Sequence, residues 1–108
     1  MAVKNLEPAE VARGMKENKV VLVDVREPHE HEAECIEGAI LLPLSQFDPR
    51  HLPEAAGKSV VLHCGSGMRS AKAIAACESA GVAVDSHVRG GIQAWKAAGL
   101  PTKPGRTK

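Results

Sequence analysis

Apolar residues in this chain come in short runs, and the segments between the runs carry the spacing of helices. The run at residues 20–25 is continuous except for Asp24, which is typical of a strand covered on both faces. Val11 and Met15 lie four positions apart and predict one apolar helix face. The predicted strands are residues 20–25, 39–42, 60–63 and 84–88. The predicted helices are residues 8–16, 28–34 and 69–80 and a last one that carries Trp95, with a helical turn or loop at 45–50.

Strands and helices therefore alternate, which predicts an α/β fold with a parallel sheet and helices on both faces. We expect four to five strands, with residues 60–63 as the central one. A chain of 108 residues suits a single core. From Pro101 onward the composition changes to Pro, Gly, Lys, Arg and Thr. We therefore expect one domain over residues 1–102 and a frayed basic tail over residues 103–108.

Charge and cysteine content narrow the function classes. A net charge of +1 and a pI near 7.8 give no overall attraction to nucleic acid or to an anionic membrane. Three cysteines without a CxxC pair argue against a disulfide framework and for a reducing compartment. No apolar stretch is long enough to span a membrane, and the amino terminus lacks the pattern of a signal peptide. The expectation is a cytoplasmic protein with no nucleic-acid or membrane partner.

The most informative segment is Cys-Gly-Ser-Gly-Met-Arg-Ser at residues 64–70. It follows a predicted strand and precedes a predicted helix, where open α/β sheets place their ligands. Free N–H groups and the helix dipole favour anions there and help a thiol to ionise. Gly65 and Gly67 let the backbone curl until several N–H groups converge.

These features predict a thiolate nucleophile, Cys64, inside an anion pocket. Arg69 adds a positive charge suited to a sulfonate or phosphate, and the two serines add hydroxyl donors. The residues expected to contact the substrate are Gly65, Ser66, Gly67, Met68, Arg69 and Ser70. His63 should point away from Cys64 by strand alternation, and is a poor candidate for a general base.

Other polar residues give weaker signals. His29, His31 and Cys35 match no common zinc spacing, so no metal is expected. Cys77 fits a core position on the helix after the loop. Cys35 as a thiol that pairs with Cys64 stays an open alternative, because the sequence gives no distance between them.

Four segments form a recognisable series along the chain. They are Asp-Val-Arg-Glu at 24–27, Cys-Ile-Glu-Gly-Ala-Ile at 35–40, the cysteine loop at 64–70, and Arg-Gly-Gly-Ile-Gln-Ala-Trp at 89–95 with Ala-Gly-Leu-Pro at 98–101. In this order they resemble the rhodanese family of sulfurtransferases over roughly residues 5–102. In the second segment, Cys35 and Glu37 replace the family's usual His and Pro. In the third, Gly65 stands where thiosulfate-using members often have Arg.

The resemblance implies a single rhodanese-like domain that moves sulfane sulfur through a persulfide on Cys64. The donor would be a small anion, thiosulfate or a low-molecular-weight persulfide, and the acceptor a thiol or a protein. Asp24 and Arg26 would lie near the loop and brace it. The resemblance implies no cofactor.

Two alternatives stay open. A cysteine-dependent phosphatase or arsenate reductase also combines Cys with Arg, but that class places Arg after five intervening residues, where this chain has Ser70. The shorter loop fits a single sulfur better than a phosphate. A noncatalytic rhodanese-fold interaction module is the other alternative, since a fold does not determine a function.

Overall fold

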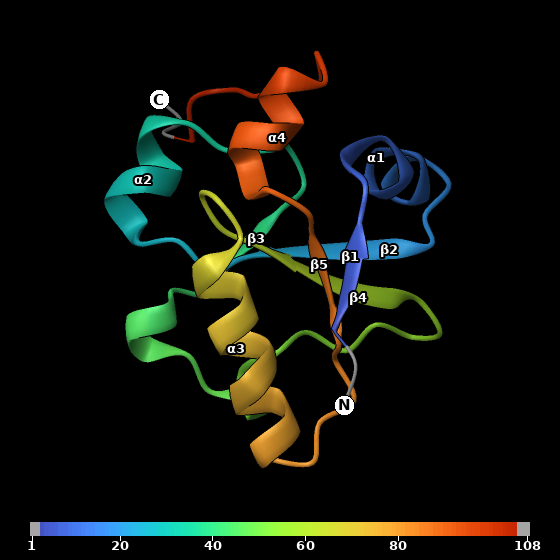
Figure 1. Cartoon of the computed structure of the whole chain (residues 1–108), viewed down its shortest axis with the longest axis vertical. Coiled ribbons are helices and arrows are strands. Elements are labelled where there is room, and N and C mark those ends of the chain that lie inside the picture. Colours follow the sequence, from blue (N-terminus) through green and yellow to red (C-terminus); the bar gives the residue numbers. More distant parts are fainter. Residues whose placement is uncertain (1–2, 106–108) are drawn as a thin grey trace.

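A computed structural model of the chain describes residues 3–105. Its five strands form one parallel sheet in the order β1-β5-β4-β2-β3, with helices packed on the sheet (Figure 1). The elements are β1 (Lys4–Leu6), α1 (Pro8–Lys16), β2 (Val20–Asp24), α2 (Pro28–Ala33), β3 (Ile40–Leu41), η1 (Leu44–Gln46), η2 (Pro49–His51), β4 (Ser59–His63), α3 (Met68–Ser79), β5 (Ser86–Val88) and α4 (Gly91–Ala97). No helix among the described residues has the length and apolarity needed to cross a membrane.

The predicted α/β fold is confirmed, with β4 as the middle strand of the sheet. Strands β2, β3 and β5 are shorter than predicted, with β3 covering only Ile40–Leu41, whereas β4 begins one residue earlier, at Ser59. Segment 45–50 forms the two short 3-10 turns η1 and η2. The fifth strand, β1, was not predicted, because its three residues include only one apolar side chain, Leu6.

The sheet has an apolar layer on each face, as the continuous apolar strands predict. Leu22 and Val61 point to one face and Val23 and Leu62 to the other, since side chains alternate along a strand. One layer packs with α1 and α4 and contains Trp95. The other packs with α3 and contains Cys64 itself. The nucleophile predicted from the sequence is therefore part of a packed core.

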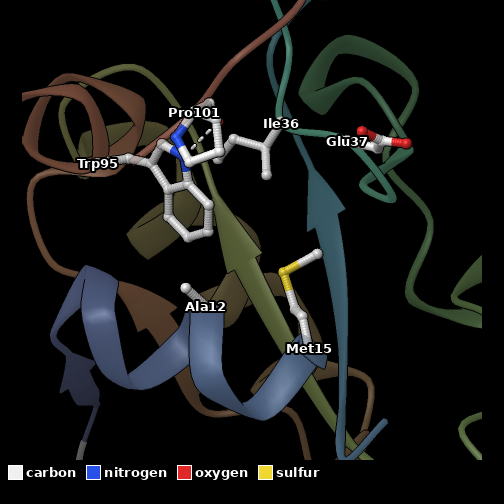
Figure 2. A pocket seen from close by; sticks show the side chains of 6 residues that line it. All are labelled: Ala12, Met15, Ile36, Glu37, Trp95 and Pro101. Carbon is white, nitrogen blue, oxygen red and sulfur yellow. Dashed lines mark hydrogen bonds between the residues drawn. The ribbon is translucent and has the colours of Figure 1, made fainter. Parts of the chain in front are cut away.

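A small apolar pocket of about 200 Å³ opens between α1 and α4. Figure 2 shows Trp95 above Ala12 and Met15, and the Trp95 Nε1–H group donates to the Pro101 carbonyl at 2.8 Å. The pocket is lined by Ala12, Met15, Ile36, Glu37, Trp95 and Pro101. Because no residue of the cysteine loop lines it, the pocket is separate from the predicted chemistry.

The chain after α4 returns to α2 (Figure 1). Lys103 exchanges two backbone hydrogen bonds with Cys35, at 2.7 and 2.9 Å, and the Gly105 N–H donates to the Glu32 carbonyl at 3.0 Å. Residues 103–105 of the predicted frayed tail are thus hydrogen bonded, because the end of α2 offers partners for their backbone. Residues 106–108 of that predicted tail lie outside the described residues.

This contact leads to a prediction about stability. Truncation after Thr102 should lower the free energy of unfolding by about 1–3 kcal/mol, since it removes three backbone hydrogen bonds worth about 1 kcal/mol each. Truncation after Gly105 keeps those bonds and is the matched control. Urea unfolding curves of the two truncated proteins measure the difference, and equal midpoints would contradict the prediction.

Candidate active site

The cysteine loop lies at the carboxyl end of β4, between that strand and α3. Gly67 takes a φ of 110° and is the N-cap residue directly before α3. The loop's carbonyls are held by the first turn of α4: the Ile92 N–H donates to the Cys64 carbonyl at 2.8 Å, and the Gln93 N–H to the Gly65 carbonyl at 3.2 Å. The start of α4 thus fixes the backbone on which Cys64 is mounted.

Cys64 is 1% exposed, and its sulfur faces hydrogen-bond donors. The Gly67 N–H donates to Sγ at 3.0 Å, and the Ser70 hydroxyl lies 3.6 Å from it. Burial raises the pKa of the thiol. Hydrogen bonds from the Ser70 side chain and from the backbone of Ser70, Gly67 and Ser66 outweigh burial, so the pKa falls below its usual value.

Ser70 connects Cys64 to two residues that the sequence reasoning missed. Its fully buried hydroxyl lies 2.7 Å from His87 Nδ1 on β5, and His87 Nε2 lies 2.8 Å from Asn5 Oδ1 on β1. His87 lies in β5 directly after the polar residues Asp85 and Ser86, so no break in an apolar run marked it in the sequence. Asn5 belongs to the strand that was not predicted, so no pattern pointed to it.

Arg69 makes a double ion pair with Glu30 on α2. Its two terminal nitrogens lie 2.6 and 3.0 Å from the two carboxylate oxygens. The hydrogen bond from Arg69 lowers the pKa of Glu30 to about 2, so the carboxylate is ionised at neutral pH. The cation expected to bind the substrate therefore already faces an anion, Glu30, which the sequence analysis did not single out.

Asp24 and Arg26 form a buried ion pair at the carboxyl end of β2. Arg26 donates to Asp24 through Nε at 3.0 Å and Nη2 at 2.8 Å. His31 Nδ1 lies 2.8 Å from the same carboxylate. Burial raises the pKa of Asp24, but hydrogen bonds from the side chains of Arg26 and His31 and from the Arg26 backbone outweigh burial and hold the pKa below its usual value.

This ion pair lies beside the residue that precedes the nucleophile. Asp24 is paired in register with His63 across the sheet, and their side chains approach to 3.8 Å. His63 is fully buried, with Nδ1 at 3.2 Å from the Cys64 carbonyl, and within residues 3–105 its Nε2 has no hydrogen-bond partner. Burial lowers the pKa of His63 despite the Asp24 charge, which keeps the ring neutral.

Two of the remaining residues predicted to contact the substrate are exposed to solvent. Met68 is 73% exposed, and Ser66 is also exposed, so both can meet a molecule that arrives from solvent. Gly65 approaches Arg69, whose Nη2 would lie 3.1 Å from a side-chain Cβ at that position. The other two cysteines, Cys35 and Cys77, are buried and free, and burial raises the pKa of both. Neither is a ready nucleophile.

Comparisons with known proteins found similar sequences and similar structures. The family model described as Rhodanese-like domain matches residues 7–98. An uncharacterized protein, slr1261 of Synechocystis, is 51% identical over 87 residues, which cover 81% of this chain and 49% of that protein. This chain thus spans about half the length of that relative.

Two further comparisons cover most of both chains. A protein of Allochromatium vinosum named "Sulfurtransferase" is 38% identical over 82 residues, 76% of this chain and 77% of that protein. The crystal structure of a rhodanese-related protein from Thermoplasma volcanium has a TM-score of 0.78 at 28% identity and covers 93% of this chain and 97% of that one. The similarity therefore extends over nearly the whole length of this chain and of the Thermoplasma volcanium protein.

The contact between α4 and the loop leads to a prediction. A Cβ on Gly91 would lie 2.4 Å from the Cys64 carbonyl oxygen and 2.6 Å from the Gly65 carbonyl, so Gly91→Ala must displace the loop. Its φ of +62° adds strain of about 1–2 kcal/mol. We expect a loss of stability of about 2–4 kcal/mol and slower alkylation of Cys64.

Gly99→Ala is the matched control, because Gly99 also has a positive φ, +79°, but a Cβ there meets no atom of the described part of the chain within 4 Å. It should cost only the backbone strain and leave Cys64 alkylation unchanged. Thermal unfolding and timed alkylation of both variants test the prediction. Similar results for the two variants would show that the close approach of α4 does not govern the loop.

Proposed function

The chain belongs to the rhodanese-like domain family, and we propose that it is a sulfurtransferase that carries sulfane sulfur as a persulfide on Cys64. The observation that carries this proposal is the buried Cys64 sulfur, which faces the Gly67 N–H and the Ser70 hydroxyl and has a lowered pKa. The name of the Allochromatium vinosum relative supports the same reaction class.

The first step is displacement at sulfur. The Cys64 thiolate attacks the outer sulfur of a sulfane donor; an Sγ–S bond forms, and the electron pair of the donor's S–S bond leaves with sulfite or a thiolate. The persulfide that results is an anion of the same charge, so the donors that hold the thiolate can also hold it. No redox cofactor is needed, because sulfur passes with its electron count preserved between donor and enzyme.

In the second step a nucleophilic acceptor takes the terminal sulfur and restores the thiolate. Met68 and Ser66, both exposed beside Cys64 on the loop, are the residues that an acceptor meets first. Asp24 and Arg26 support the loop from β2 through His63. The substrate contacts proposed here are those of the loop: Gly65, Ser66, Gly67, Met68, Arg69 and Ser70.

The proposal predicts a covalent intermediate. Purified protein incubated with thiosulfate, or separately with glutathione persulfide, should gain the mass of about one sulfur atom, and cyanide should reverse the gain. Cys64→Ser should gain none, whereas Cys77→Ser keeps the reactive thiol and is the matched control. Intact mass spectrometry gives the readout. No gain with either donor would overturn the proposed function.

The Glu30–Arg69 ion pair leads to a prediction about the KM for an anionic donor. Glu30→Gln removes the carboxylate that occupies Arg69, so the guanidinium becomes available to an anionic donor. We expect KM for thiosulfate to fall about three- to tenfold with a smaller change in kcat, since one charged contact is worth about 1 kcal/mol at a part-exposed site.

Glu54→Gln is the control, because it makes the same charge change at an exposed residue of the segment between η2 and β4. It should leave KM unchanged. Steady-state rates of sulfite release from thiosulfate measure both variants. An unchanged or higher KM for Glu30→Gln would mean that the pair braces the loop and does not limit access to Arg69.

A further inference from the structure

A line of hydrogen bonds leads from the reactive sulfur to the surface edge of the sheet. It passes from Cys64 to Ser70 on α3, then to His87 on β5, and ends at Asn5 on β1, with separations of 3.6, 2.7 and 2.8 Å. Ser70 is 0% and His87 5% exposed, whereas Asn5 is exposed. Four residues from four parts of the chain thus connect a buried thiol with solvent.

The order of donors along this line follows from the chemistry of its last member. Asn5 Oδ1 can only accept, so His87 Nε2 carries the proton and Nδ1 is left with a free lone pair. The Ser70 hydroxyl therefore donates to Nδ1, and its oxygen can accept from the Cys64 thiol. Each donor points away from the sulfur, as a proton path requires.

The two ring nitrogens of His87 make the hydrogen bonds of this line, to Ser70 and to Asn5. Its neighbours in register are Asn5 on β1 and Leu62 on β4, and α3 contributes Ser70. Burial lowers the pKa of His87, so the ring is neutral before reaction, and the lone pair at Nδ1 faces the Ser70 hydroxyl. Arg69 interacts electrostatically with Cys64 and is itself paired with Glu30.

We propose that His87, acting through the Ser70 hydroxyl, holds the proton that leaves the Cys64 thiol. The S–H bond breaks as its proton passes to Ser70 Oγ, the former Ser70 proton passes to His87 Nδ1, and the electron pair stays on Sγ. The products are a thiolate and an imidazolium, with no change in net charge. Both imidazolium N–H groups then have acceptors, Ser70 Oγ and Asn5 Oδ1.

His87 and Asn5 are positioning residues in this scheme, because neither touches the reacting sulfur. The proposal deepens the proposed sulfurtransferase function but can be tested without it. Alkylation of Cys64 by iodoacetamide requires the thiolate and no sulfur donor. The pH midpoint of alkylation can therefore shift as expected even if sulfur transfer fails, and sulfur transfer can stand even if the midpoint does not shift.

The experiment compares alkylation rates of Cys64 against pH in the full chain. Trypsin separates the three cysteines onto the peptides 27–50, 59–69 and 73–89, so mass spectrometry reads Cys64 alone on the second one. Asn5→Asp places an anion beside Nε2 and stabilises the imidazolium, so the midpoint should fall by about one pH unit. His87→Leu removes the proton acceptor, so the midpoint should rise by about one pH unit or more.

Two features keep this test decisive. Asn5 is exposed, so Asn5→Asp should fold even if a substitution at buried His87 does not. In His87→Leu the Ser70 hydroxyl keeps the Gly67 carbonyl, 3.2 Å away, as an acceptor. Lys4→Ala is the matched control, since it changes the same strand at a residue whose ammonium lies near Asp85, and it should leave the midpoint unchanged.

Opposite shifts in the two variants would support the proton path, because a general loosening of the site moves both midpoints the same way. Two midpoints equal to that of the wild type, or two midpoints shifted in the same direction, would overturn the proton path. Ser70 and the loop backbone would then be the groups that set the reactivity of Cys64.

Discussion

A charged sulfur held away from water needs other hydrogen-bond donors, and this requirement governs the arrangement around Cys64. Removing an anion from water costs several kcal/mol even after relaxation. A hydrogen bond to a charged group returns about 1.5–3 kcal/mol, so only several together can offset that cost. The Gly67 N–H, the Ser70 hydroxyl and their neighbours on the loop serve this purpose, provided that the loop stays curled. The hydrogen bonds from the first turn of α4 to the Cys64 and Gly65 carbonyls hold the loop in this curled conformation.

The sequence predicted the elements that make this site but not all of their contacts. The Cys-Gly-Ser-Gly segment after an apolar run predicted a loop between a strand and a helix, and β4 and α3 flank it as expected. Helix α1 has the predicted bounds, because its apolar spacing and Pro8 are local signals. Such features are determined by neighbours in the chain, which a single sequence displays directly.

Contacts between distant segments could not be predicted in the same way. Strand β1 has three residues, two of them exposed, and exists because β5 offers it a free edge. Asn5 reaches His87, 82 positions away, only through that pairing. Glu30 carries no signal of its own in the sequence, because its ion pair with Arg69, 39 positions away, depends on how α2 packs beside the loop. The hydrogen bonds of residues 103–105 likewise depend on tertiary packing.

The two sides of the loop differ in electrostatic character. This difference separates the groups suited to binding an anionic donor from those suited to moving a proton. On the side of β2 and α2, ion pairs dominate: Arg69 with Glu30, and Arg26 with Asp24. On the side of α3, β5 and β1, the line from Ser70 to Asn5 is built from neutral groups. An anionic donor interacts with fixed charges, so its binding should depend on the first side. A proton moves most easily along neutral groups that can both donate and accept, and the second side connects such groups in a continuous line. Because Cys64 lies between them, the binding of the donor and the ionisation of the thiol can be altered by separate substitutions.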